Sequence, residues 1–219
     1  MTQTDPVVWL ADRRAAMHYV ASSLTAVEAA RFARMRSPQR RLQWQISRAL
    51  LAQLGSLDGA RSLSHSGEFA ALAVDPTARA VGIDLEVIRP RDFLRLAQAA
   101  FAPAECRDAE LLQPGLLARY FYQLWTLKEA FAKALQLPLT VALRDCVVER
   151  HGPRWSVQVP TDEPWRLQSW QPRPDLILTL VSIGARAGAF APRPCSTCDW
   201  PTADASPWQL LVELSSADS

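Results

Sequence analysis

Alternating and continuous apolar stretches predict most of the strands in this chain. Residues 69–74 form a continuous apolar run typical of a buried strand, and residues 80–87 include an alternating stretch. Asp75-Pro76-Thr77 is typical of a turn, so a β-hairpin is predicted over 69–87. A polar turn is predicted just before it, at 64–67. Further strands are predicted at 7–10, 61–64, 143–149, 154–159, 165–170 and 176–184, with Trp208–Leu214 packing back as another strand.

Helical spacing and capping residues predict the helices. Thr25 and Glu28 have the spacing of a capping box, and Ser37-Pro38 combines an N-cap residue with proline at the first helical position. Gly55 is typical of a residue that ends a helix. Helices are therefore predicted from Thr25 to about Arg34, from Ser37 to Gly55, and over 92–100, 103–112 and 115–135. The order β-αα-ββ-ααα-ββββ is typical of an α+β fold.

Composition limits the kinds of protein that this chain can be. Of 219 residues, 49% are hydrophobic and 21% are charged, which excludes a wholly disordered chain. The formal net charge of +2 is too small for a nucleic-acid coat or a strongly basic membrane surface. The N-terminus has no signal-peptide pattern, and no apolar run approaches the roughly 20 residues that span a bilayer. We therefore expect a cytoplasmic protein without nucleic-acid or membrane partners.

The lysines and cysteines are few and unevenly placed. Of 24 basic residues only Lys128 and Lys133 are lysines, which suggests that a compact ammonium is needed there. Cys195 and Cys198 form a Cys-x-x-Cys pair without the second pair that a zinc ribbon requires. This pair is either part of a surface tail or a metal or redox site.

Two carboxylates share one face of the predicted strand 80–87. Asp84 and Glu86 lie at positions i and i+2, while Ile83 and Leu85 point to the other face. Such a pair faces solvent on an edge strand, holds a cation between its members, or keeps one member protonated.

A second candidate group lies on the predicted helix 115–135. Trp125, Glu129 and Lys133 recur at every fourth position and so form one stripe. Glu129 and Lys133 are either an exposed ion pair or part of a partly buried site. If Glu129 faces Asp84 and Glu86, the three carboxylates suit Mg²⁺ shared with phosphates, and Lys133 adds a point charge for those phosphates.

Basic residues earlier in the chain allow two interpretations. His65, between two serines, is either structural or part of a phosphate cradle. Five arginines near the first two predicted helices form either a solvated face or a phosphate-binding patch: Arg31, Arg34, Arg36, Arg40 and Arg41. Sequence motifs of hydrolase triads, P-loops and dinucleotide-binding folds are absent from the chain.

Together these stretches resemble the 4′-phosphopantetheinyl transferases. The matching segments are Ser64-His65-Ser66, Gly82-Ile83-Asp84-Leu85-Glu86 and the stretch 125–133, in the order and spacing of the larger, surfactin-synthetase-activating type. The stretches 101–105 and 120–122 also resemble the family, and the resemblance covers roughly residues 20–185. Members usually carry a Gly-Lys-Pro or Gly-Arg-Pro strand before the Ser-His-Ser segment, and no such motif occurs at 55–63.

The resemblance implies two pseudo-symmetric α/β halves with the active site at their interface. The halves would be residues 1–88 and 89–190, followed by a tail at 191–219. It implies Mg²⁺ held by Asp84, Glu86 and Glu129 together with the pyrophosphate of coenzyme A. The residues that it implies for coenzyme A are Arg34, Arg41, Ser64, His65, Lys128 and Lys133, with Ser64 and His65 at the 3′-phosphate.

The implied activity is transfer of 4′-phosphopantetheine from coenzyme A to a serine of an apo acyl or peptidyl carrier protein, releasing 3′,5′-ADP. Glu129 is the expected base, acting directly or through a water, and Lys133 is expected to offset charge on the leaving group. We expect a monomer that serves fatty-acid, polyketide or nonribosomal-peptide synthesis. Two alternatives are a non-catalytic relative that binds coenzyme A or a carrier protein, and a Mg²⁺-dependent nucleotide phosphatase.

Overall fold

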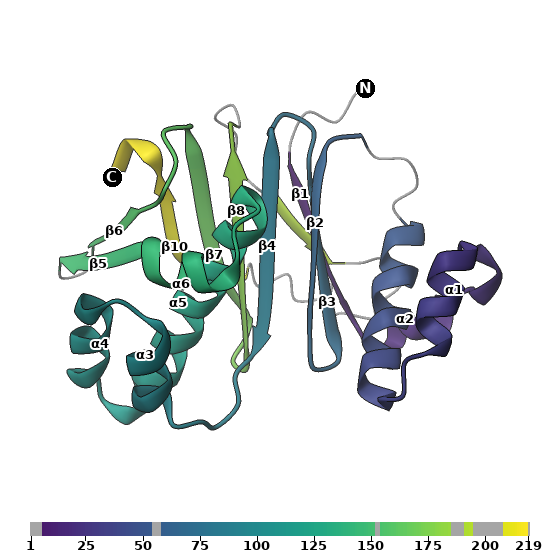
Figure 1. Cartoon of the computed structure of the whole chain (residues 1–219), viewed down its shortest axis with the longest axis horizontal. Coiled ribbons are helices and arrows are strands. Elements are labelled where there is room, and N and C mark those ends of the chain that lie inside the picture. The colour runs from purple at the N-terminus through teal and green to yellow at the C-terminus, as the bar shows by residue number, and fades with distance from the viewer. Residues whose placement is uncertain (1–5, 54–57, 152–153, 185–190, 195–207, 219) are drawn as a thin grey trace.

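Two four-stranded sheets lie between two groups of helices in this protein (Figure 1). The computed structural model describes residues 6–53, 58–151, 154–184, 191–194 and 208–218. The strand orders are β2-β3-β1-β9 in the first sheet and β10-β7-β8-β4 in the second, and β5 pairs with β6. The strands are β1 (Val7–Asp12), β2 (Ala60–Ser66), β3 (Phe69–Asp75), β4 (Ala80–Val87), β5 (Val147–His151), β6 (Arg154–Gln158), β7 (Trp165–Arg173), β8 (Leu176–Ile183), β9 (Ala191–Pro194) and β10 (Gln209–Ser215).

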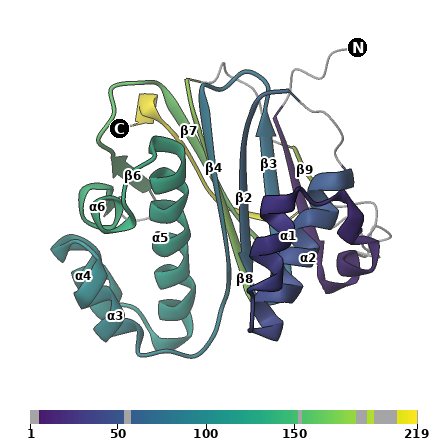
Figure 2. The ribbon, with the colours of Figure 1, turned by 45° about the vertical axis from the view of Figure 1, so that its right-hand side comes forward.

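The helices lie on the outer faces of the two sheets (Figure 2). They are α1 (Ala26–Ala33), α2 (Pro38–Gln53), α3 (Phe93–Ala100), α4 (Pro103–Glu110), α5 (Pro114–Leu135) and α6 (Leu139–Asp145), with short 3₁₀ turns at Arg13–His18, Ala21–Ser23 and Ser216–Asp218. The mixture of helices and sheets confirms the predicted α+β class. Among the described residues, no helix is both long and apolar enough to cross a membrane.

The predicted helix starts are confirmed by their capping contacts. Glu28 donates its backbone N–H to the Thr25 hydroxyl, and the Glu28 carboxylate accepts the Thr25 N–H in return. The Ser37 hydroxyl accepts the Arg40 N–H at the start of α2. The predicted stop at Gly55 lies outside the described residues.

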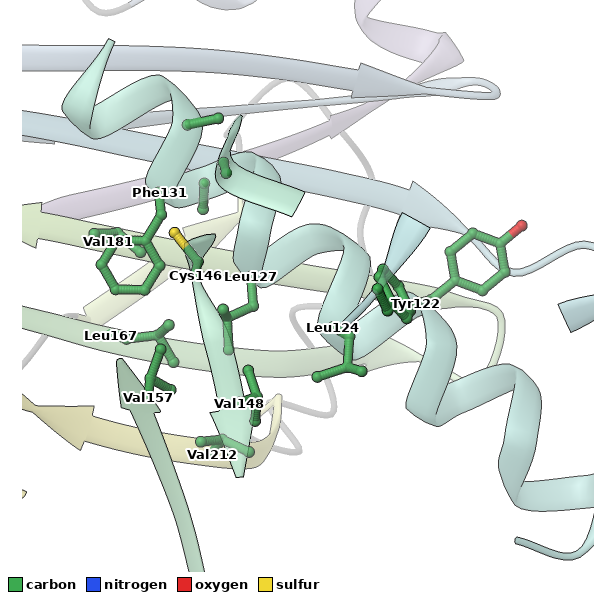
Figure 3. Packing of buried hydrophobic residues seen from close by; sticks show 14 of the residues in the cluster. Tyr122, Leu124, Leu127, Phe131, Cys146, Val148, Val157, Leu167, Val181 and Val212 are labelled. Atoms are coloured by element: carbon green, nitrogen blue, oxygen red, sulfur yellow. The ribbon is translucent and has the colours of Figure 1, made fainter. Parts of the chain in front are cut away.

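Apolar side chains fill three layers between these elements. The facing sides of the two sheets share one cluster, which includes Leu10 of β1 and Ile83 of β4. The outer face of the first sheet packs against α2 through Ile46 and Leu50. The outer face of the second sheet packs against α5 through residues such as Leu127 and Phe131 (Figure 3). This packing fixes α2 against the first sheet and α5 against the second sheet.

The predicted hairpin over 69–87 is wrong, because β3 and β4 belong to different sheets. β3 pairs with β2 and β1, whereas β4 pairs antiparallel with β8. The Asp75 carboxylate accepts the backbone N–H of Thr77 and Ala78, which turns the chain after β3. Its other oxygen accepts the hydroxyl of Ser182 on β8, so the turn is tied to the second sheet.

Two further predictions of local structure are corrected. Residues 64–66 belong to β2 rather than to a turn, because they pair with β3, and the chain reverses at Gly67, where φ is +57°. Residues 143–145 are helical rather than extended, since they end α6. Trp208–Leu214 packs back as predicted, because β10 pairs with β7 there.

The sheets divide the chain differently from the predicted halves at 1–88 and 89–190. β4 lies within the first predicted half but pairs in the second sheet. β9 lies in the predicted tail but pairs parallel with β1 in the first sheet. The predicted Cys195-x-x-Cys198 site lies outside the described residues.

Candidate functional site

β2 is an edge strand of the first sheet and β4 is an edge strand of the second sheet, and these two strands run side by side (Figure 1). We call the line between them the seam. Apolar side chains of β4 face the first sheet, while Gly82, Asp84 and Glu86 alternate with them. A Cβ added at Gly82 would lie 1.9 Å from the carbonyl oxygen of Ala130, so only glycine allows α5 to approach β4 so closely. This close approach brings Glu129 and Lys133 of α5 beside the acids of β4.

Lys133 reaches the seam and contacts three protein oxygens there. Its ammonium lies 2.7 Å from Asp84 Oδ1 and 2.9 Å from the carbonyl oxygen of Ile83. It also donates to the Ser64 hydroxyl at 3.1 Å. The Lys133 side chain remains 32% exposed, whereas that of Asp84 is 2% exposed. The lysine is therefore open to a ligand, while the aspartate is fixed by its surroundings.

Glu86 and Glu129 complete a group of three acids, which together with Lys133 we call the acid cluster. Burial raises the pKa of Glu129 to about 7, and the charges of Asp84 and Glu86 add to the rise while Lys133 opposes it. Burial also raises the pKa of Glu86, although its hydrogen bond from the Ser66 hydroxyl at 2.6 Å acts in the other direction. The structure thus brings together the acids that the sequence places on a strand and a distant helix.

The donor set of the acid cluster suits a hard divalent cation. In the described part of the chain, no three acidic, histidine or cysteine side chains already stand in metal-binding geometry. Asp84 Oδ2, however, is buried and has no hydrogen-bond partner within the described ranges, while Oδ1 is occupied by Ser64 and Lys133. An unpartnered buried carboxylate oxygen is costly unless a cation or donor completes it. On chemical grounds the three carboxylates therefore fit Mg²⁺.

A basic cavity of about 880 Å³ opens on the other side of β2, and we call it the arginine cavity. His65 lines it, together with Trp44 and Ser47 of α2, whose indole N–H and hydroxyl are buried and have no hydrogen-bond partner among the described residues. The described lining residues include no acid, although Arg48 is paired with Glu28 at 2.7 Å. The arginines that line the cavity are Arg31, Arg34, Arg36, Arg40 and Arg48. Such a wall of donors suits an anionic group, above all a phosphate.

Neighbouring residues of β2 face these two places. His65 faces the arginine cavity, whereas the hydroxyl of Ser64 donates to Asp84 at 2.8 Å on the seam. Adjacent strand residues point to opposite sides, so the predicted shared role of Ser64 and His65 at one phosphate does not match this geometry. Ser64 is also only 6% exposed. The structure therefore brings His65 together with Arg34 and brings Ser64 together with Asp84.

Arg41 and Lys128 lie away from the positions that the resemblance implies. Arg41 is not among the residues that line the cavity, and its guanidinium stacks over the ring of Phe32 at 4.6 Å. Lys128 is fully buried and pairs with Glu105 at 2.9 Å. Its ammonium also donates to the carbonyls of Leu143 and Cys146 at the end of α6. With these contacts the Lys128 ammonium is occupied by protein groups, and no phosphate contact is available to it in this structure.

Several residues at these sites were missed by reasoning from the sequence. Ser66 belongs to the Ser-His-Ser segment, but Ser62 was missed, although Ser62, Ser64 and Ser66 alternate along β2 and this period could have indicated a common face. Trp44, Ser47 and Arg48 carried no signal, because a helix face that borders a cavity looks like any other amphipathic face.

Comparisons with known proteins agree with the resemblance in the sequence. Residues 80–181 match the model of the 4′-phosphopantetheinyl transferase superfamily. A 4′-phosphopantetheinyl transferase of Bacillus subtilis is 32% identical over 127 residues, which are 52% of this chain and 55% of that protein. The transferase psf-1 of Bacillus pumilus is 45% identical over 73 residues, 33% of this chain and 30% of the relative. AcpT of Salmonella typhi is 44% identical over 73 residues, 33% of this chain and 38% of the relative.

The matches cover only part of each protein. The aligned residues span about half of the Bacillus subtilis transferase and about a third of the other two relatives. The family match contains β4, α5 and most of β8, and therefore the whole acid cluster. The arginine cavity, built mainly from α1, α2 and β2, lies before it.

Proposed function

We propose, because residues 80–181 match the model of the 4′-phosphopantetheinyl transferase superfamily, that this protein transfers 4′-phosphopantetheine from coenzyme A to a serine of an apo carrier protein. The observation that carries the proposal is the division of β2 between two sites. His65 faces the arginine cavity and Ser64 faces the acid cluster. A ligand with phosphates at two separate places, as in coenzyme A, can use both sites at once.

The 3′-phosphate of coenzyme A fits the arginine cavity in this proposal. His65 and Arg34 both line the cavity and would supply donors to the phosphate, with Trp44 and Ser47 beside them. The Gly-Lys-Pro segment usual in the family is missing from residues 55–63, so these side chains carry more of the recognition here. Arg41 is left out of this site because it does not line the cavity.

The pyrophosphate belongs at the acid cluster in the same proposal. Asp84, Glu86 and Glu129 would hold Mg²⁺, which when bound neutralises phosphate charge. The Lys133 side chain is partly exposed, so its ammonium would exchange one of its three protein contacts for a phosphate oxygen and offset charge that develops on the leaving group. The carrier serine attacks the β-phosphate, the phosphoanhydride bond breaks and 3′,5′-ADP leaves. These residues act mainly by positioning and by electrostatics.

Glu129 is the proposed acceptor of the serine proton. Its pKa of about 7 in the metal-free protein lies near the working pH, as a general base requires. Coordination of a metal would lower that pKa, so a water between Glu129 and the serine is an equal route.

We also propose that the protein is of the surfactin-synthetase-activating type, with both halves of the active site in one chain. Each sheet carries one long helix on its outer face, α2 on the first and α5 on the second. This arrangement supports two pseudo-symmetric halves that meet at the seam. Because one chain supplies both the acid cluster and the arginine cavity, a monomer suffices for the reaction.

The proposal is tested by incubating the protein with apo carrier protein, coenzyme A and Mg²⁺ and measuring the carrier mass. A gain of one phosphopantetheine is expected, and an unchanged mass in the presence of a carrier accepted by known transferases contradicts it. That negative result is what a non-catalytic relative or a nucleotide phosphatase gives.

The position of the 3′-phosphate is tested with dephospho-coenzyme A. We expect wild type to discriminate against this ligand, and His65→Ala to reduce the discrimination roughly tenfold because one hydrogen bond to a charged group is lost. Arg41→Ala is the matched control and should discriminate against dephospho-coenzyme A as wild type does, since Arg41 is outside the cavity. Equal discrimination by His65→Ala and wild type would remove His65 from the phosphate site.

A further inference from the structure

A row of three serine hydroxyls bridges the two sheets along the seam. Ser62, Ser64 and Ser66 of β2 accept the backbone N–H groups of Ile83, Leu85 and Val87 of β4, at 3.1, 3.3 and 3.1 Å respectively. β2 and β4 are both edge strands of their own sheets. An edge strand leaves a row of N–H groups without partners, and here side chains of the neighbouring strand accept them.

Two of these serines hold a carboxylate as well. Ser64 donates to Asp84 at 2.8 Å, and Ser66 donates to Glu86 at 2.6 Å. The residue of β4 that corresponds to Ser62 in this series is Gly82, which has no side chain. Ser62 therefore accepts a backbone N–H of β4 but does not bind a carboxylate. It serves as a control that separates the contact between the strands from the contact with an acid.

The Ser64 hydroxyl uses its full hydrogen-bonding capacity. A hydroxyl has one proton to donate and two lone pairs to accept with. Ser64 donates to Asp84 and accepts from the Leu85 N–H and from the Lys133 ammonium at 3.1 Å. One hydroxyl thus joins both strands of the seam, an acid of β4 and the lysine of α5.

We infer that the serine row joins the edge strands β2 and β4 of the two sheets and that Ser64 is a positioning residue which orients Asp84. With its hydroxyl saturated by protein groups, Ser64 is not a phosphate ligand. By occupying Asp84 Oδ1, it leaves the unpartnered Oδ2 as the oxygen available to a cation. The part of this inference that concerns the cation rests on the proposed function, whereas the part that concerns the seam does not.

Amide hydrogen exchange, resolved by residue, tests the seam without any activity measurement. Ser62→Ala should speed exchange of the Ile83 amide roughly tenfold, Ser64→Ala that of Leu85 and Ser66→Ala that of Val87, each with smaller effects on the other two. Ser64→Thr keeps the hydroxyl and should retain protection of Leu85, which serves if the alanine variant folds poorly. Unchanged exchange at the matching amide in all three alanine variants would overturn the serine row.

Cation binding and ligand choice test the positioning role. In the absence of coenzyme A, Ser64→Ala should bind Mg²⁺ roughly tenfold more weakly than wild type, and Ser62→Ala should bind it as wild type does. Ser64→Ala should also keep the preference for coenzyme A over dephospho-coenzyme A that His65→Ala loses. Equal Mg²⁺ affinity of Ser64→Ala and Ser62→Ala, or loss of that preference in Ser64→Ala, would overturn the positioning role. If wild type itself binds no Mg²⁺, the proposed function loses its metal, while the exchange experiment still decides the serine row.

Discussion

Helix α5 carries two lysine–carboxylate contacts that share their chemistry and differ in their surroundings. Lys128 and Glu105 are both 0% exposed, and Lys128 also caps the carbonyls at the end of α6. Lys133 is 32% exposed and contacts Asp84, one oxygen of which has no partner. The Lys128–Glu105 contact is closed to solvent, whereas Lys133 in the Lys133–Asp84 contact can exchange a protein partner for a ligand. Burial, rather than residue type, separates the lysine that is closed to solvent from the lysine that is open to it.

The largest effect is expected from Lys128→Met. It removes the cation from the fully buried Glu105, and breaking a buried pair in this way costs about 3–5 kcal/mol of unfolding free energy. Glu105 keeps its acceptor contacts with the N–H groups of Ala102 and Val148, so the fold should persist at low temperature. Urea unfolding measures the loss.

Two further variants serve as controls for that measurement. Lys133→Met should cost less, about 1–2 kcal/mol, because the Lys133 side chain is partly exposed and Asp84 keeps the Ser64 donor. Adding Glu105→Gln to Lys128→Met should recover part of the loss by removing the unpaired charge. A larger cost for Lys133→Met than for Lys128→Met would reverse the roles of the two lysines.

The residues of both contacts could be found from the sequence only in part. The stripe of Trp125, Glu129 and Lys133 and the acids of β4 follow from helical and strand periods, which are local. Glu105 gave no such signal, because its pairing with Lys128 depends on how α4 packs against α5. The resemblance implies a coenzyme A contact for Lys128, although Lys128 lies about 100° around the helix from Glu129.

The fold shows the same limit. Helix starts at Thr25 and Ser37 depend on side chains a few residues away and were predicted correctly. The pairing of β4 with β8 depends on residues almost a hundred positions apart, and local turn residues after β3 favoured a hairpin instead. The seam between β2 and β4 was beyond prediction for a related reason, because it is made by side chains and not by a backbone ladder.

The next largest effects are expected from replacing each lysine with arginine, which should separate a loss of turnover from a loss of stability. Lys133→Arg keeps the charge, but its planar fork replaces a compact ammonium at the phosphates, so we expect turnover with carrier protein to fall roughly 10- to 100-fold with little loss of stability. Lys128→Arg should instead lower stability by about 1–3 kcal/mol through overpacking, with turnover per folded molecule unchanged. Steady-state kinetics at a temperature where both variants are folded compares them. Full turnover in Lys133→Arg together with an inactive, stable Lys128→Arg would mean that the phosphates meet the other face of α5.

The smallest effect concerns pH and sharpens the contrast between open and closed sites. Burial and the neighbouring acids raise the pKa of Glu129 to about 7, above its ordinary value of 4.5. The folded protein then holds this proton more tightly than the unfolded chain. The stability that Glu129 contributes is therefore complete at low pH and is lost as the pH rises through 7. In metal-free buffer, wild type should lose about 1–2 kcal/mol relative to Glu129→Gln between pH 5 and 8, somewhat less than full linkage because solvent partly screens the site. Urea unfolding of both proteins over this range gives the difference, and added Mg²⁺ should reduce it because a cation binds the ionised cluster. Parallel stability curves for the two proteins would mean that Glu129 does not share its surroundings with Asp84 and Glu86, and the open site on α5 would then lack the crowding on which its chemistry depends.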